Sequence, residues 1–236
     1  MDIEVKGDIV NDDDKWIYDW FGISAVSPKD VTNALNSANG QAITVKVNSG
    51  GGSVFAASEI YTSLKNYKGD VNIEIQGLAA SAASVISMAG KSKMSPTAQM
   101  MIHNVSTGTQ GDYRDMQHSA EILKNANKTV ASAYILKSGL SEEEVLNMMN
   151  EETWLTAQQA KDLGLIDEIM FNNSLINFGN IDLKAMYNSL PSIPNEIIQK
   201  MKENNKDSQP IENEVDFLNL EKKILQNEIN KKRWNL

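Results

Sequence analysis

The 236-residue chain contains no cysteine and only two histidines, His103 and His118. The lack of cysteine excludes disulfides, thiol nucleophiles and thiolate metal sites, and only these two residues could supply an imidazole to a metal. Any catalysis is therefore expected to depend on hydroxyl and carboxylate groups, with at most one or two imidazoles.

Positive charge is also scarce, because 22 lysines and arginines face 31 aspartates and glutamates, giving a net charge of −9 at pH 7. A chain of this charge repels a phosphate backbone, and no basic cluster interleaved with aromatic residues offsets the repulsion. The composition therefore predicts no nucleic-acid partner.

Long hydrophobic runs are absent. The most apolar stretch, GLAASAASVISMAG at 77–90, is about 14 residues long, and a membrane span requires about 20. The chain opens with Met1, Asp2, Ile3 and Glu4, which lacks the cationic start of a secretory signal. We expect no membrane association, no export and a cytoplasmic location, with residues 77–90 in a soluble core.

A P-loop is missing as well. Gly90, Lys91 and Ser92 resemble the end of that motif, but Val85 stands where its first glycine is required. This class of nucleotide site is excluded.

The sequence does contain alternating strand-like and helix-like segments. Buried strands are predicted at 42–47, 71–76 and 99–103, and helices at 28–37, 54–65 and 113–137. Ser27 and the segments 141–144 and 156–159 have the pattern of helix N-caps, and Gly139 marks the end of the longest helix. This alternation favours an α/β domain with parallel strands up to about residue 170.

The composition changes after Met170. Asparagine becomes frequent, and Pro191 and Pro194 interrupt the pattern, so 171–210 is predicted to be a connecting region. Over 211–236 apolar residues recur at spacings of three and four, with Lys222 in one position that should be apolar. This segment is predicted to be an amphipathic or coiled-coil helix, which either self-associates or folds back on its own domain.

Two stretches rich in small residues are candidate sites. NSGGGSV at 48–54 places three glycines between a strand and a helix, where backbone amides can face an anion, although a plain tight turn has the same pattern. Ser81 falls near a helix start, where free N–H groups favour a developing negative charge. Ser84 and Ser87 lie deeper and are expected to pack the helix, and small residues serve helix packing equally well.

The two histidines differ in their surroundings. His103 ends a buried strand, at the edge where α/β sheets commonly hold their sites, although a core histidine has the same pattern. His118 lies within a long charged helix and is expected to be a surface or packing residue.

Three motifs together, NSGGGSV, GLAASAAS and MMIHN, resemble the proteolytic subunit of the Clp protease family, ClpP, in order and approximate spacing. The resemblance continues through AEILKNANK and TWLTAQQAKDLGLIDEI and covers about residues 40–170. It implies a ClpP/crotonase-type spiral of ββα units with a long handle helix, followed by a C-terminal helical tail. The expected organisation is a protease domain over 1–170, a connecting region over 171–210 and a helix over 211–236.

The resemblance also implies roles for particular residues. Ser81 matches the family's nucleophile and His103 its base, while the amides of Gly52 and Ala82 match its oxyanion hole. The resemblance implies a serine endopeptidase that acts on polypeptides and needs no metal or bound cofactor.

The third member of the family's triad is an aspartate, and here Glu152 stands at the matching position. A glutamate can still accept the imidazole N–H, as in hydrolases with a Ser-His-Glu triad. Glu151 and Asp162 are the alternatives if Glu152 does not reach the imidazole.

Family members form stacked rings and receive unfolded chains from a separate ATPase, so the resemblance implies a homo-oligomer and a possible Clp-type ATPase partner that alone uses ATP. The segment 1–24 resembles the short start of phage and prophage relatives, which makes a head-maturation protease acting on capsid proteins a variant of the same chemistry. Two other interpretations stay open: a crotonase-type thioester enzyme, and a non-catalytic assembly protein in which Glu152 marks a decayed triad.

Overall fold

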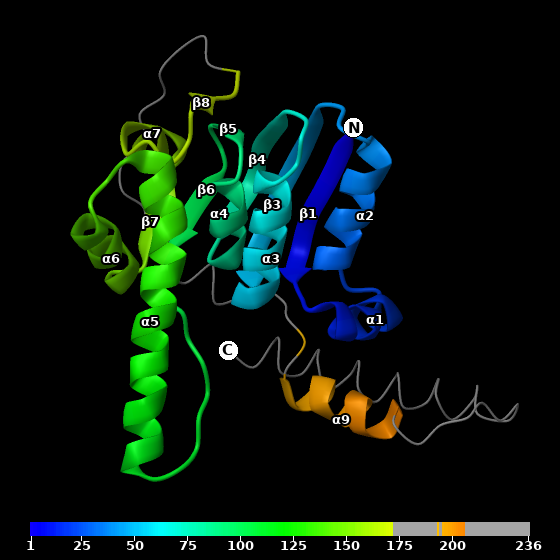
Figure 1. Cartoon of the computed structure of the whole chain (residues 1–236), viewed down its shortest axis with the longest axis vertical. Helices are drawn as coiled ribbons and strands as arrows, with labels where there is room; N and C mark the ends of the chain where they lie inside the picture. The colour runs from blue at the N-terminus through cyan, green and yellow to red at the C-terminus, as the bar shows by residue number, and fades with distance from the viewer. Residues whose placement is uncertain (172–192, 194, 206–236) are drawn as a thin grey trace, which may run out of the picture.

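The computed structural model describes residues 1–171, 193 and 195–205, and its centre is a single twisted sheet (Figure 1). The strands of this part of the chain are β1 (Asp2–Ile9), β2 (Ala25–Val26), β3 (Ile43–Gly52), β4 (Val71–Ala80), β5 (Lys91–Met94), β6 (Gln99–Ile102), β7 (Thr153–Thr156) and β8 (Glu168–Ile169). They follow the order β2-β1-β3-β4-β5-β8, and β6 pairs with both β4 and β7. Every pairing is parallel except that of β6 with β7.

The helices of the described residues are α1 (Asp12–Phe21), α2 (Pro28–Ala38), α3 (Val54–Lys65), α4 (Ala82–Ser87), α5 (Tyr113–Ser138), α6 (Glu142–Asn150), α7 (Ala157–Asp162) and α9 (Asn195–Asn205). Ser27, Ser141 and Thr156 each form a complete capping box, and Gly139 ends α5 in the left-handed conformation. These local signals are the ones that the sequence displays, and the predicted α/β class is confirmed.

Two stretches differ from the prediction. β4 continues to Ala80, beyond the predicted end at 76, and the first 26 residues form β1, α1 and β2, which were not predicted. The short β2 pairs with the end of β1, so the N-terminal segment extends the sheet by two strands.

The sheet has one apolar face and one polar face. Val45, Val47 and Ile73 are fully buried, whereas the alternating positions carry side chains such as Lys46 and Glu74 that reach solvent. Figure 1 shows α2, α3 and α4 on the same side of the sheet. The core therefore lies between that side and its helices, and the helices that carry the site are packed on it.

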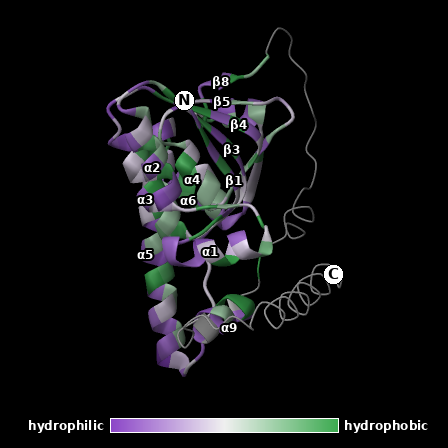
Figure 2. Ribbon diagram, turned by 90° about the vertical axis from the view of Figure 1, so that its right-hand side faces the viewer, coloured by the Kyte–Doolittle hydropathy of each residue, from purple (hydrophilic) through white to green (hydrophobic). Residues whose placement is uncertain are grey.

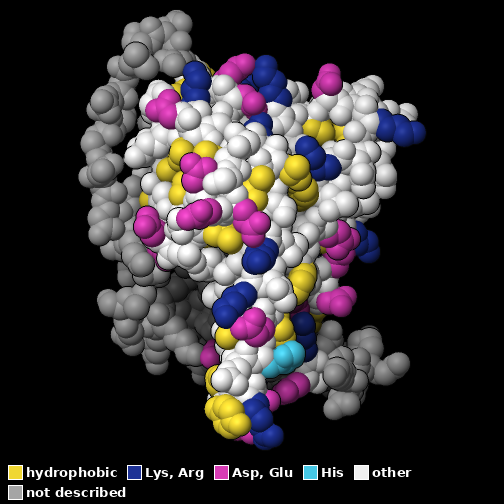
Figure 3. Space-filling view, turned by 60° about the vertical axis from the view of Figure 1, so that its left-hand side comes forward, with side chains coloured by type: hydrophobic (Ala, Val, Ile, Leu, Met, Phe, Trp, Pro, Cys, Tyr) yellow, Lys and Arg dark blue, Asp and Glu magenta, His cyan; other side chains and the backbone are white. Residues whose placement is uncertain are grey.

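The long helix α5 has two different ends. Near its C-terminus Ala131, Ala133 and Tyr134 are buried, whereas its N-terminal half projects beyond the sheet with Tyr113 and Ile122 exposed (Figure 1). Figure 3 shows apolar and charged side chains mixed on this projecting half. The helix is therefore anchored at one end only within the described chain.

The helix α9 lies within the predicted connecting region 171–210. Figures 1 and 2 both show α9 below α1, and Ile197 and Met201 pack into a small cluster with Ile17 and Tyr18 of α1. Lys202 adds an ion pair with Asp14. The helix forms because its apolar residues fall on one side, although prolines and asparagines dominate the surrounding composition. The helix predicted over 211–236 lies outside the described residues.

No helix among residues 1–171 and 195–205 combines the length and the apolar character that a membrane crossing requires.

Candidate active site

Ser81 occupies the junction between β4 and α4 in an unusual backbone conformation. Its φ of 53° and ψ of −125° lie in a region of backbone conformation that residues other than glycine rarely adopt. Such a conformation costs about 1–3 kcal/mol and persists where the surroundings impose it, often at active sites. The Ser81 N–H donates to the carbonyl of Met101 at 2.9 Å, which ties the junction to β6. A strand–turn–helix junction with a serine at its turn thus forms without the G-x-S-x-G motif.

The glycine run 50–52 packs closely against this junction. A Cβ at Gly51 would lie 2.8 Å from both the Ser81 Cβ and the Ala80 carbonyl oxygen, and the Gly51 φ is +104°. A Cβ at Gly52 would lie 2.1 Å from the Ile9 carbonyl oxygen. Both positions therefore require glycine. The contact of Gly51 with Ser81 was not predicted, because three successive glycines give no sign of which one faces the serine.

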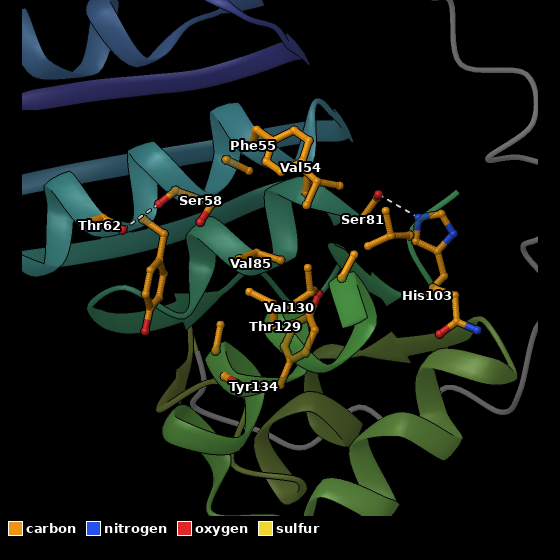
Figure 4. A pocket seen from close by; sticks show the side chains of 18 of the residues that line it. Val54, Phe55, Ser58, Thr62, Ser81, Val85, His103, Thr129, Val130 and Tyr134 are labelled. Atoms are coloured by element: carbon orange, nitrogen blue, oxygen red, sulfur yellow. Dashed lines mark hydrogen bonds between the residues drawn. The ribbon is translucent and has the colours of Figure 1, made fainter. Parts of the chain in front are cut away.

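His103 follows directly after β6 and points at Ser81 (Figure 4). Its Nε2 atom lies 2.7 Å from the Ser81 Oγ atom. Burial lowers the pKa of His103 below its ordinary value, and the nearby charge of Glu152 acts in the opposite direction without cancelling the effect. The neutral imidazole, which can accept a proton, is thereby favoured near neutral pH.

Glu152 comes immediately before β7. In the antiparallel pairing Met101 faces Trp154 and Ile102 faces Thr153, so the next position along the register brings Glu152 opposite His103. Glu152 has a φ of 51°, and its Oε1 atom accepts a long hydrogen bond of 3.5 Å from the Trp154 indole. Its charge acts on the pKa of His103, which places the carboxylate in the neighbourhood of the imidazole.

The alternative carboxylates are placed differently. Glu151 is exposed at the end of α6, and Asp162 is exposed and accepts a 2.7 Å hydrogen bond from Gln158. His118 is exposed on the projecting half of α5. The structure therefore brings Ser81, His103 and Glu152 to one edge of the sheet.

A pocket of about 270 Å³ opens beside Ser81, between α3 and α5. Figure 4 shows Val54, Val85 and Val130 along it, with Ser81 and His103 at one end and Thr62 toward the other. Its walls near the serine are mainly apolar. The sequence motifs did not predict this pocket, because its walls come from two helices far apart in the chain.

A hydroxyl, an imidazole and a carboxylate at neighbouring register positions have the composition of an acyl-transfer site. The described residues hold no group of three or more His, Cys, Asp or Glu side chains that could bind a metal ion. The chemistry that this geometry can perform is nucleophilic attack by a serine hydroxyl with an imidazole as base.

Comparisons with known proteins agree with this geometry. The family model described as Clp protease matches residues 30–173. The ATP-dependent Clp protease proteolytic subunit 1 of Chlamydia abortus is 37% identical over 139 residues, which cover 56% of this chain and 72% of that protein. A proteolytic subunit of Bacteroides fragilis is 37% identical over 134 residues, 56% of this chain and 65% of its own length. One from Streptococcus pneumoniae is 38% identical over 138 residues, 56% of this chain and 70% of that protein.

Proposed function

Because the chain belongs to the Clp protease family and is thereby a serine peptidase, we propose that it is an endopeptidase whose catalytic triad is Ser81, His103 and Glu152. The family predicted from the sequence motifs is confirmed by the match over 30–173. The observation that carries the triad is the 2.7 Å contact between the Ser81 Oγ and the His103 Nε2.

In the proposed reaction, the Nε2 atom of His103 accepts the Ser81 hydroxyl proton while Oγ attacks the carbonyl carbon of a peptide bond. The imidazolium then gives this proton to the amine nitrogen as the C–N bond breaks. Water attacks the acyl-enzyme, loses its proton to His103, and releases the acid with Ser81 restored. Glu152 accepts a hydrogen bond from the Nδ1–H group of His103 and stabilises the imidazolium. Its favourable effect on the charged form of His103 supports this role.

The oxyanion that forms needs donors close to Ser81. We assign this function to the backbone N–H groups of Gly52 and Ala82. The close packing of the neighbouring Gly51 against Ser81 and the Ala82 nitrogen supports the assignment, because it brings the glycine run next to the serine. The acyl-transfer scheme uses no metal and no bound cofactor.

The substrates in this proposal are polypeptides whose side chain before the scissile bond is apolar. The pocket beside Ser81 is lined near the serine by Val54, Val85 and Val130, and its volume of about 270 Å³ suits one medium or large side chain. Farther from Ser81 the pocket is lined by hydroxyl groups, such as those of Ser58 and Thr62, which can bind water.

The active form proposed is a homo-oligomer, and its partner is a separate ATPase of the Clp type. The exposed Tyr113, Met116 and Ile122 on the projecting half of α5 support contact with a second copy, because apolar side chains of this size are usually covered. The three relatives named above are ATP-dependent proteolytic subunits by name, which supports the ATPase.

A second candidate is the processing of phage capsid proteins by the same chemistry. In its favour, residues 1–29 lie outside the family match. These residues form α1, and α9 packs against α1. This addition fits a subunit adapted to an assembly partner. A defined capsid-protein substrate would distinguish it from general proteolysis.

The test combines a fluorogenic peptide with an apolar residue before the bond and a fluorophosphonate probe, applied to the full chain, to Ser81→Ala and to Ser37→Ala. Ser37 is an exposed serine on α2 and serves as the control. The assembly mass of each variant is measured in parallel.

We expect the wild type and Ser37→Ala to hydrolyse the peptide and to be labelled, and Ser81→Ala to lose roughly 10⁴-fold or more in kcat and all labelling. An assembled wild type that resists the probe would refute the proposal and favour the assembly protein. Turnover of a thioester without peptidase activity would favour the crotonase-type enzyme.

A further inference from the structure

Two buried hydroxyl groups lie behind Ser81 and take no part in the acyl-transfer scheme. Ser84 on α4 is 0% exposed and Tyr134 on α5 is 1% exposed, and their hydroxyl oxygens are 2.7 Å apart. Burial raises the pKa of Tyr134, so its hydroxyl is protonated at neutral pH. The pair forms a buried hydrogen bond between two helices that lie far apart in the sequence.

The direction of this hydrogen bond follows from a second one. The Ser84 Oγ atom lies 2.6 Å from the carbonyl oxygen of Ser81, which can only accept. The single hydroxyl proton of Ser84 is therefore donated to Ser81, and its oxygen accepts the proton of Tyr134. The result is an ordered relay from Tyr134 through Ser84 to the Ser81 carbonyl.

The relay fixes the orientation of the peptide group between Ser81 and Ala82. The Ser81 carbonyl and the Ala82 N–H belong to the same planar group and point in opposite directions. The Ser84 backbone N–H also donates to this carbonyl, at 3.0 Å, so two donors of Ser84 fix its orientation. Hydrogen bonds to the carbonyl also polarise the peptide group and strengthen its N–H as a donor.

We propose that Ser84 and Tyr134 are positioning residues that orient and polarise the Ser81–Ala82 peptide, so that the Ala82 N–H faces the oxyanion of the transition state. The inference rests on the proposed function, in which Ala82 is an oxyanion donor. Neither hydroxyl touches the reacting atoms. Their effect passes through the peptide plane, whose orientation relative to Ser81 is the ψ of −125°.

The chain offers a matched control for this proposal. Ser87 lies on the same short helix, is also 0% exposed, and donates its hydroxyl proton to the Ala83 carbonyl at 2.9 Å. Ser87→Ala therefore removes the same group from the same kind of hydrogen bond, but from the Ala83–Ser84 peptide, whose N–H donates to the Ser81 carbonyl and not to the proposed oxyanion.

The experiment measures kcat and KM for Ser84→Ala, Tyr134→Phe, their double variant and Ser87→Ala. We expect Ser84→Ala to lower kcat about 30-fold and Tyr134→Phe about 5-fold, with KM nearly unchanged, since loss of a whole oxyanion donor costs about 10²–10³-fold. The double variant should match Ser84→Ala because the two hydroxyls act in series. Ser87→Ala should stay within about 2-fold of wild type.

A peptide aldehyde gives the readout that a purely structural role would not change. The aldehyde forms a hemiacetal with Ser81, and the hemiacetal oxygen lies in the oxyanion hole. A peptide product binds without forming this hemiacetal. In Ser84→Ala the aldehyde affinity should fall by the same factor as kcat/KM, and product affinity should hold.

Equal kcat values for Ser84→Ala and Ser87→Ala, or equal losses of aldehyde and product affinity, would overturn the proposal. In either case a dead Ser81→Ala variant alongside an active wild type would leave the proposed function standing.

Discussion

The strand β4 joins two regions of different character. Its first half, up to Ile75, keeps an unbroken parallel register with both β3 and β5. Its second half leaves β5 for β6, shifts its register against β3 so that Ser49 faces Ala79, and ends at the left-handed Ser81. The regular half belongs to the core, and the irregular half positions the proposed chemistry.

The change between the two halves has a visible cause. A Cβ at Gly77 would lie 2.5 Å from the Asn48 Oδ1 atom, and this same atom accepts the Leu78 N–H at 3.1 Å. A side chain thus takes the place of a strand hydrogen bond, which the missing side chain of Gly77 permits. Substitutions in the second half should therefore alter activity, and those in the first half should alter stability.

The largest effect is expected at the irregular end. Glu152→Gln removes the charge that favours protonated His103, so kcat should fall about 10³–10⁴-fold with little change in Tm. Because that charge raises the pKa of His103, its removal should lower this pKa further, and the acidic limb of kcat/KM should move to lower pH. A pH–rate profile measures both the fall in kcat and the shift of the acidic limb.

Glu151→Gln is the matched control, because Glu151 is the exposed neighbour. A loss of activity in Glu151→Gln that Glu152→Gln does not show would transfer the carboxylate role to Glu151.

The regular half of β4 should respond in the opposite way. Ile73 is 0% exposed, and Ile73→Ala should lower the free energy of unfolding by about 3 kcal/mol through lost burial and a residual cavity. Activity per folded molecule should stay within about 2-fold of wild type. Urea titration measures the stability, and Gln76→Ala, at the exposed position next to this half, is the control. A large fall in kcat at unchanged stability would remove the distinction between the halves.

A smaller effect is expected where α5 is tied to β5. Asp167 accepts the Ser92 N–H at 2.6 Å and pairs with Lys137. Burial raises the pKa of Asp167, but the bonds from Lys137 and Ser92 outweigh this and leave it below its ordinary value. Asp167→Asn should cost about 1 kcal/mol at pH 7, a figure discounted for the partial exposure of the carboxylate.

This stabilisation has a definite pH dependence. A carboxylate with a lowered pKa in the folded chain stabilises above its unfolded pKa, and the contribution disappears as the pH falls through the folded value. The difference between wild type and Asp167→Asn should therefore shrink below about pH 4. Chemical denaturation at several pH values measures it, and a gap that widens in acid would contradict the assignment.

The smallest effect concerns the polar face of the sheet. Lys91 on β5 forms an ion pair of 3.0 Å with Glu168 on β8, and both side chains are largely exposed. Lys91→Gln should shift Tm by no more than about 1 °C, and added salt should not enlarge the shift. A larger shift in a thermal melt would mean that this face contributes to the stability of the regular half.

The sequence predicts those features whose causes are local. α2, α3 and α5 begin and end close to their predicted positions, because Ser27 and Gly139 act within one turn of the chain. Ser81 and His103 could be named as site candidates from their motifs, and the structure brings them within hydrogen-bond distance.

Features that depend on distant partners could not be predicted in this way. The left-handed φ of Ser81 is imposed by β6 and by the glycine run, and the relay through Ser84 needs Tyr134 from another helix. Ser84 looked like a packing residue because its neighbours are small. The family resemblance points to Glu152, but its position opposite His103 depends on the antiparallel register of β6 and β7.

The order of the elements along the chain also determines when the residues of the site are made. Ser81 and His103 emerge from the ribosome well before Glu152, since α5 and α6 are made in between. A nascent chain that ends before β7 lacks the carboxylate that orients the base in the proposed triad. The proposed triad is therefore complete only once β7 has been made and has joined β6 in the sheet.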